Sequence, residues 1–156
     1  MSANRRGQAA RELDTMITAA RVFAAITAES IAQAEAGLTL PQLRVLVLAA
    51  QIEPLSATDV ATALDIHLST ASRICDRLVR SGLLDRRDRA DDRRHLAITL
   101  TEEGRRQLDS IHAHRRQVFR RLLRRMDPAQ RAGVAQALQD FVEAAREYDS
   151  AQTLIP

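Results

Sequence analysis

The chain has 156 residues, which is long enough for one domain with a substantial hydrophobic core. All 23 basic residues are arginine, yet the formal net charge is only +3, which excludes a non-specific polycation. One cysteine excludes an internal disulfide framework, and no stretch reads as a signal peptide or as an uninterrupted apolar run of 18 residues. We therefore expect a soluble cytoplasmic protein, and the five glycines and four prolines indicate a mainly α-helical fold.

A long helix is predicted from about residue 11 to residue 36. Apolar side chains recur along it at helical spacing, namely Leu13, Met16, Ile17, Ala20, Phe23, Ala24, Ile31 and Ala34. Such a stripe has to be buried against another surface.

Two short helices joined by a tight turn are predicted between residues 56 and 81. Ser56 is a suitable N-cap for the first helix, whose apolar stripe is formed by Val60, Ala61 and Leu64. Residues 65–68 leave room only for a turn before the second helix at residues 69–81. This arrangement is a helix-turn-helix.

The second of these helices has two faces of different chemistry. Ala71, Ile74, Cys75 and Leu78 form an apolar face, while the outward candidates for DNA contact are Ser69, Thr70, Ser72, Arg73 and Arg77, with Arg80 one turn further. Hydroxyl and guanidinium groups suit the major groove, where arginine bonds the O6 and N7 atoms of guanine. A solvated amphipathic helix is the alternative, because arginine is an ordinary surface residue.

An arginine-rich β-hairpin is predicted after this helix. Gly82 stands where a left-handed residue ends the helix, Leu83 begins an extended segment, and residues 95–100 alternate as a second strand. The tip between the strands holds five Arg and four Asp, so it favours a shaped contact with a few arginines presented. The tip candidates for DNA contact are Arg89, Arg93 and Arg94, with Asp92 orienting Arg94 by an ion pair.

Two further helices are predicted at the C-terminal end. The first, at about residues 101–126, carries the stripe Leu108, Ile111, Val118, Leu122 and Met126. Asp127-Pro128 ends it, and the next helix carries Val134, Leu138, Phe141, Val142 and Ala145. A winged helix is too small to cover all these stripes, so a homodimer is expected. A two-fold dimer would place two reading helices about 34–36 Å apart on a palindrome.

These segments resemble the MarR family of transcriptional regulators. The family's wing pattern is Asp-x-Arg, five residues, then Leu-Thr, and Asp92, Arg94, Leu100 and Thr101 match it. The segments 38–50, 54–64, 69–84 and 100–106 are similar to the family's in order and spacing, and the resemblance covers roughly residues 11–148. It implies a mainly α winged helix-turn-helix with long terminal dimerisation helices.

The resemblance also implies an organisation and a mode of control. Residues 1–50 would hold the N-terminal dimerisation helix and the first helix of the DNA-binding lobe, 51–100 the winged helix-turn-helix, and 101–156 the C-terminal dimerisation helices. The implied function is a repressor that binds a palindromic operator and is released by a small anionic or aromatic ligand. Phe23, Arg44 and His67 are candidates for lining that ligand region, although each fits an ordinary core or surface role better.

Other functions find little support in the sequence. The four histidines show no zinc-ligand spacing, and there is no phosphate loop, nucleophile elbow or paired carboxylate motif, so we expect no metal, no cofactor and no catalytic residue. Two alternatives stay open. One is a winged helix that docks an acidic protein without specific DNA binding, and the other is a redox-responsive regulator that uses Cys75.

Overall fold

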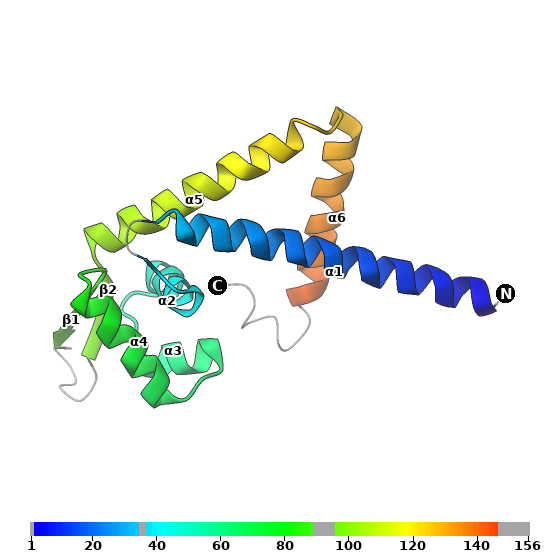
Figure 1. Ribbon diagram of the computed structural model, residues 1–156. Helices are drawn as coiled ribbons and strands as arrows, with labels where there is room; N and C mark the ends of the chain where they lie inside the picture. Colours follow the sequence, from blue (N-terminus) through cyan, green and yellow to red (C-terminus); the bar gives the residue numbers. More distant parts are fainter. Residues whose placement is uncertain (1, 35–36, 89–95, 147–156) are drawn as a thin grey trace.

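The computed structural model describes residues 2–34, 37–88 and 96–146, and it has two parts (Figure 1). Three long helices lie above a smaller lobe of three short helices and a hairpin, with α3 and α4 at the end of the lobe away from the long helices. In chain order the elements are α1 Ser2–Ala32, α2 Leu40–Gln51, α3 Ala57–Leu64, α4 Leu68–Arg80, β1 Leu84–Asp88, β2 Leu96–Leu100, α5 Glu102–Leu123 and α6 Pro128–Arg146. The predicted mainly α winged-helix fold is confirmed.

Local capping signals explain where the helices of the lobe begin and end. Thr39 and Ser56 each form a capping box at the start of α2 and α3, with Gln42 and Asp59 as the reciprocal partners. Helix α3 ends on Asp65 in the left-handed region at φ 50°. Gly82, at φ 72°, takes the left-handed conformation that the sequence predicted after α4.

The long helices differ from their predicted bounds. Helix α1 begins at Ser2 rather than near residue 11 and ends at Ala32 rather than at 36. No proline interrupts its first turns, so the helix extends beyond the apolar stripe. Helix α5 ends at Leu123, three residues before the predicted end. The backbone there tightens into bonds from Arg125 N–H to Leu122 O and from Met126 N–H to Leu123 O.

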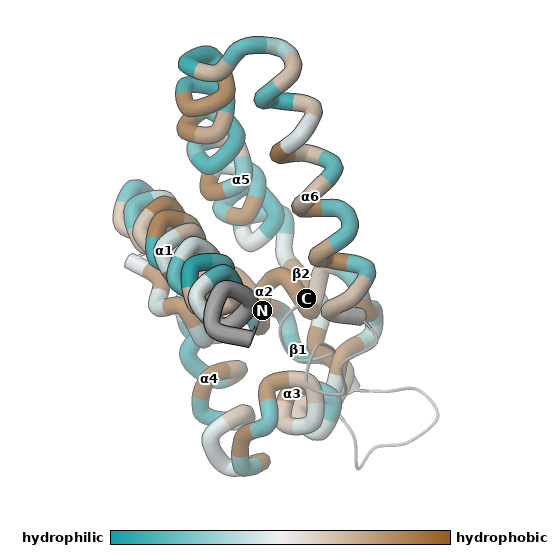
Figure 2. The backbone as a smooth tube through the Cα atoms, turned by 90° about the vertical axis from the view of Figure 1, so that its right-hand side faces the viewer, coloured by the Kyte–Doolittle hydropathy of each residue, from teal (hydrophilic) through white to brown (hydrophobic). Residues whose placement is uncertain are grey.

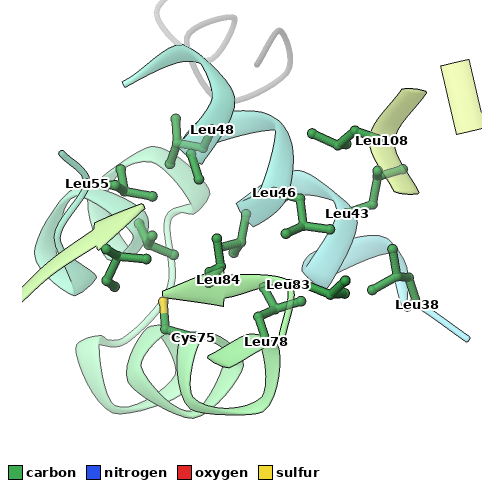
Figure 3. Packing of buried hydrophobic residues seen from close by; sticks show 14 of the residues in the cluster. Leu38, Leu43, Leu46, Leu48, Leu55, Cys75, Leu78, Leu83, Leu84 and Leu108 are labelled. Carbon is green, nitrogen blue, oxygen red and sulfur yellow. The ribbon is translucent and has the colours of Figure 1, made fainter. Parts of the chain in front are cut away.

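The hydrophobic core lies in the lobe and is centred on α2 (Figure 3). Val45 and Leu46 of α2 are completely buried. Figure 3 shows Cys75 and Leu78 of α4 on the side of the helix that faces Leu46 and the hairpin. Leu55 pairs with Ile98 through two backbone bonds, of 3.0 and 2.7 Å, which adds a third strand contact to the hairpin. The position of α4 is therefore set by a packed surface behind it.

The hairpin is locked to the start of α5. Strand β1 pairs antiparallel with β2, with Leu84 opposite Leu100. The Thr101 hydroxyl lies 2.7 Å from Gly82 O and 3.0 Å from Leu83 O, and it accepts a 2.9 Å bond from Gly104 N–H. A Cβ on Gly104 would lie 2.2 Å from Leu83 O, so only glycine permits this close approach.

Helix α1 contacts α5 near the lobe, and both helices then extend away from it. Phe23 and Phe119 pack with ring centroids 6.0 Å apart, and Glu29 Oε1 lies 3.4 Å from His114 Nε2. Buried Ile31 and Ala34 join the core of the lobe, whereas Leu13, Met16 and Ile17 of the same predicted stripe are exposed.

Apolar side chains remain uncovered along all three long helices. Figure 2 shows apolar and polar residues alternating along α1, α5 and α6. The exposed large apolar residues of these helices are Leu13, Met16, Ile17, Val22, Phe23, Leu122, Leu123, Val134, Leu138, Phe141 and Val142. The segment of α1 at residues 7–32 is also long enough and apolar enough to cross a membrane, judged by length and composition alone, with a mean hydropathy of 1.2. An apolar surface of this extent is typical of an interaction site.

Candidate nucleic-acid interface

Helix α4 presents a polar and basic face to solvent because its opposite face is anchored in the core. Ala71, Cys75 and Leu78 are fully buried, as the sequence predicted, and Ile74 is half-buried. Of the predicted DNA-contacting residues of α4, Ser69, Arg73 and Arg77 are exposed, and Thr70 and Ser72 are half-buried. The structure therefore brings these five residues together on one helix, where they border the solvent-facing side.

The arginines of this face lie along the helix and border a shallow hollow. Arg73 Nε donates to Ser69 O at 3.3 Å, and Arg80 Nε donates to Asp76 O at 3.2 Å. The hollow has a volume of about 320 Å³ and is lined by Thr70, Arg73, Ile74, Arg77 and Arg80. Guanidinium groups arranged in this way offer fork-shaped donors to phosphate or to guanine.

An ion pair that the sequence analysis missed ties α4 to the hairpin. Arg86 of β1 donates to Asp76 Oδ1 of α4 at 2.7 Å, with both side chains partly buried. This contact neutralises the carboxylate on the reading helix and fixes the base of the wing against it. Ten residues separate the partners, so only the fold of the hairpin reveals the pair.

The predicted tip residues Arg89, Asp92, Arg93 and Arg94 lie outside the described residues. In the described strands on either side of these residues, Asp88 of β1 is paired with Leu96 of β2. Strand β1 contacts α4, and strand β2 contacts α2.

The lone cysteine lies on the buried face of α4 rather than at an accessible site. Cys75 has no exposed surface. Burial raises the pKa of its thiol, an effect that Asp76 reinforces and Arg86 opposes. A raised pKa lowers the thiolate fraction at neutral pH, so this environment disfavours the redox alternative.

We expect the thiol of Cys75 to react slowly in the folded protein. With a disulfide reagent such as DTNB at pH 8, the native chain should react at least about 100-fold more slowly than the chain unfolded in guanidinium, because both access and thiolate fraction are reduced. Equal rates in the two states would show that the cysteine is accessible.

The predicted ligand-lining residues lie on three different elements, with Phe23 on α1, Arg44 on α2 and His67 at the start of α4. Phe23 packs on Phe119, and His67 is exposed at the N-cap of α4. Arg44 is half-buried on α2. A separate groove of about 500 Å³ lies between α1 and the start of α2, lined by Ala24, Thr27, Ala28, Ile31, Ala32, Leu38 and Leu40. Within the described residues, no three His, Cys, Asp or Glu side chains gather into a metal site.

Comparisons with known proteins agree with this geometry. Residues 38–96 match the model of the MarR family. The crystal structure of RV1404 from Mycobacterium tuberculosis is 39% identical in sequence, with a TM-score of 0.78 over 88% of this chain and 93% of that one. The uncharacterised HTH-type transcriptional regulator YfiV of Bacillus subtilis is 27% identical over 101 residues, which are 65% of this chain. The chain spans 63% of the length of this curated relative.

A further structure bears on control of DNA binding. BpsR from Bordetella bronchiseptica is 25% identical, with a TM-score of 0.57 over 82% of this chain and 90% of that one, and its DNA binding is described as regulated by 6-hydroxynicotinic acid.

Proposed function

The chain belongs to the MarR family of DNA-binding transcriptional regulators, and from that premise we propose that it is a ligand-responsive repressor that binds a palindromic operator as a homodimer. The observation that carries the proposal is the outward face of α4, where Ser69, Arg73 and Arg77 are exposed over a back that is anchored in the core. This face has the shape and the donors of a recognition helix.

A specific-binding assay tests this function. Fluorescence anisotropy would compare the chain's own upstream intergenic DNA with a scrambled duplex at two salt concentrations. We expect affinity at least about 1,000-fold higher for the upstream DNA, together with a clear salt dependence. Equal weak binding to both duplexes would favour the alternative in which the winged helix docks an acidic protein.

The homodimer is proposed from the uncovered stripes of the long helices. The exposed residues Leu13, Met16 and Ile17 of α1 and Leu138 and Phe141 of α6 would be buried by a second copy. Two copies would also present two α4 helices to successive turns of DNA, about 34–36 Å apart. A regulator that binds an operator on the chromosome would act in the cytoplasm.

Sedimentation tests the dimer. At micromolar concentration we expect about twice the 17.3 kDa mass of one chain. Leu138→Asp, in the stripe of α6, should shift the protein toward the monomer because it places a charge in the apolar interface, whereas Ile52→Asp on the exposed end of α2 should not. If the wild-type protein is a monomer under these conditions, the proposal that two copies bind the two half-sites of a palindrome is wrong.

The groove between α1 and α2 is the proposed site of the inducing ligand. Its lining is aliphatic apart from Thr27, so it suits an aromatic ligand better than a strongly anionic one. Such a ligand lowers DNA affinity only if it binds more tightly when the two DNA-binding lobes of the dimer are in an arrangement that does not fit the operator.

Arginines at the start of α5 are proposed to contact flanking phosphates. Arg105 and Arg106 are both exposed close to the hairpin, and Arg106 is paired with Glu103. If one of the two contacts a phosphate in each subunit, replacing both with Ala should reduce the salt slope of DNA binding by about one to two units per dimer, because fewer counterions are released from the DNA when the protein binds. The matched control replaces Arg120 and Arg121 at the far end of α5, and an equal change in both double variants would contradict a local contact.

A further inference from the structure

The first residue of helix α4 is a leucine that is exposed to solvent. Leu68 is the first residue of α4, and 53% of its surface is exposed. Leu68 lies one turn before Ala71 and two turns before Cys75, on the flank of the buried face, but at the exposed end of the helix it is not part of the hydrophobic core. One turn later on the same side is Ser72, and the next residue in the chain is the exposed Ser69.

The surroundings of Leu68 are those of a DNA-facing side chain. The N-terminal residues of a recognition helix are the ones that reach base edges. His67 provides no side-chain cap, although its carbonyl oxygen accepts from Thr70 N–H at 2.8 Å, so the uncapped N-terminus of α4 suits a phosphate oxygen. On the flank of the helix that carries Leu68 and Ser72, the carboxylate of Asp76 is neutralised by Arg86. This flank is therefore compatible with a polyanion.

Only one group in the major groove matches an aliphatic side chain. Guanine, cytosine and adenine present hydrogen-bonding atoms there, whereas thymine also presents its 5-methyl group. We propose that Leu68 contacts a thymine methyl in each half-site and is a specificity-determining residue. The inference rests on the proposed function, and it assigns a base preference to a residue of α4 whose side chain forms no hydrogen bond.

Deoxyuridine provides the test, because it differs from thymidine only in lacking the methyl group. The probe is the duplex that the wild-type dimer selects from a random pool, with each thymine replaced in turn by deoxyuridine. For the wild-type protein we expect one symmetric pair of positions to respond, with affinity about fourfold weaker for one half-site and about fifteenfold for both.

The Leu68→Ala variant should bind the deoxyuridine duplex and the thymidine duplex with equal affinity at that position. Its thermal unfolding should match that of the wild type, because Leu68 lies outside the core. Ile52→Ala removes a side chain of similar size and 45% exposure from the end of α2, and it should keep the full response to deoxyuridine.

The proposal is overturned if wild type and Leu68→Ala lose the same affinity at every replaced thymine, or if the wild type responds at none. In that event Leu68 is an ordinary exposed apolar residue. Failure of the proposed function would look different, because the wild-type protein would then not distinguish the selected duplex from a scrambled one.

Discussion

Replacing Arg73 with Ala is expected to weaken operator binding at least about 30-fold while leaving the fold and the dimer intact. A bidentate contact of arginine with guanine contributes about 1–3 kcal/mol, and the dimer would lose two of them. The Arg73 side chain is exposed, and its recorded bonds, to Ser69 O and to the Thr70 hydroxyl, both lie within the first turns of α4. The core behind the helix does not depend on it.

Two measurements and two further variants make this prediction specific. Anisotropy gives the affinity for operator and scrambled DNA, and circular dichroism shows whether the fold is retained. Arg73→Lys keeps the positive charge but lacks the planar guanidinium group, so this variant should also bind the operator weakly. Arg116→Ala on α5 removes one exposed arginine elsewhere and should have little effect. Wild-type affinity in Arg73→Ala would exclude a base contact by this residue.

Replacing Gly104 with Ala is expected to destabilise the protein by about 3 kcal/mol, at the upper end of the usual cost of overpacking. The added Cβ would lie 2.2 Å from Leu83 O and 2.7 Å from Leu100 Cδ1, and one of these atoms belongs to the backbone. Helix α5 would have to move away from the hairpin, which also strains the Thr101 cap. The melting temperature should fall by about 6–12 °C.

The chain contains a matched control for this substitution. Gly133 lies inside α6, and a Cβ there meets nothing within 4 Å. Gly133→Ala should therefore stabilise the protein by up to about 1 kcal/mol, because alanine has the higher helix propensity. Equal melting temperatures for Gly104→Ala and Gly133→Ala would show that the approach of α5 to Leu83 is not tight.

Local signals in the sequence predicted most of the fold. The N-cap at Ser56, the left-handed Gly82 and the apolar face of α4 follow from side-chain chemistry within a few residues. The helix ends near residues 32 and 123 were less well predicted, because apolar periodicity does not show how a backbone turn closes.

The candidate site was predicted only in part. The outward face of α4 could be read from helical spacing, since its residues lie three or four apart. Two contacts could not be predicted from helical spacing, because each joins elements that meet only through the hairpin. They are the ion pair of Asp76 with Arg86 and the close approach of Gly104 to Leu83. Leu68 was overlooked because an exposed apolar residue has no signal in an amphipathic pattern.

Two copies of α4 are proposed to bind a defined DNA sequence, and selection from a random duplex pool would identify that sequence. The full chain would be used to enrich bound duplexes over several rounds, followed by sequencing and affinity measurement. We expect an inverted repeat with half-site centres about 10 bp apart, bound at least about 1,000-fold more tightly than a scrambled duplex. A pool that shows no enriched sequence would contradict it.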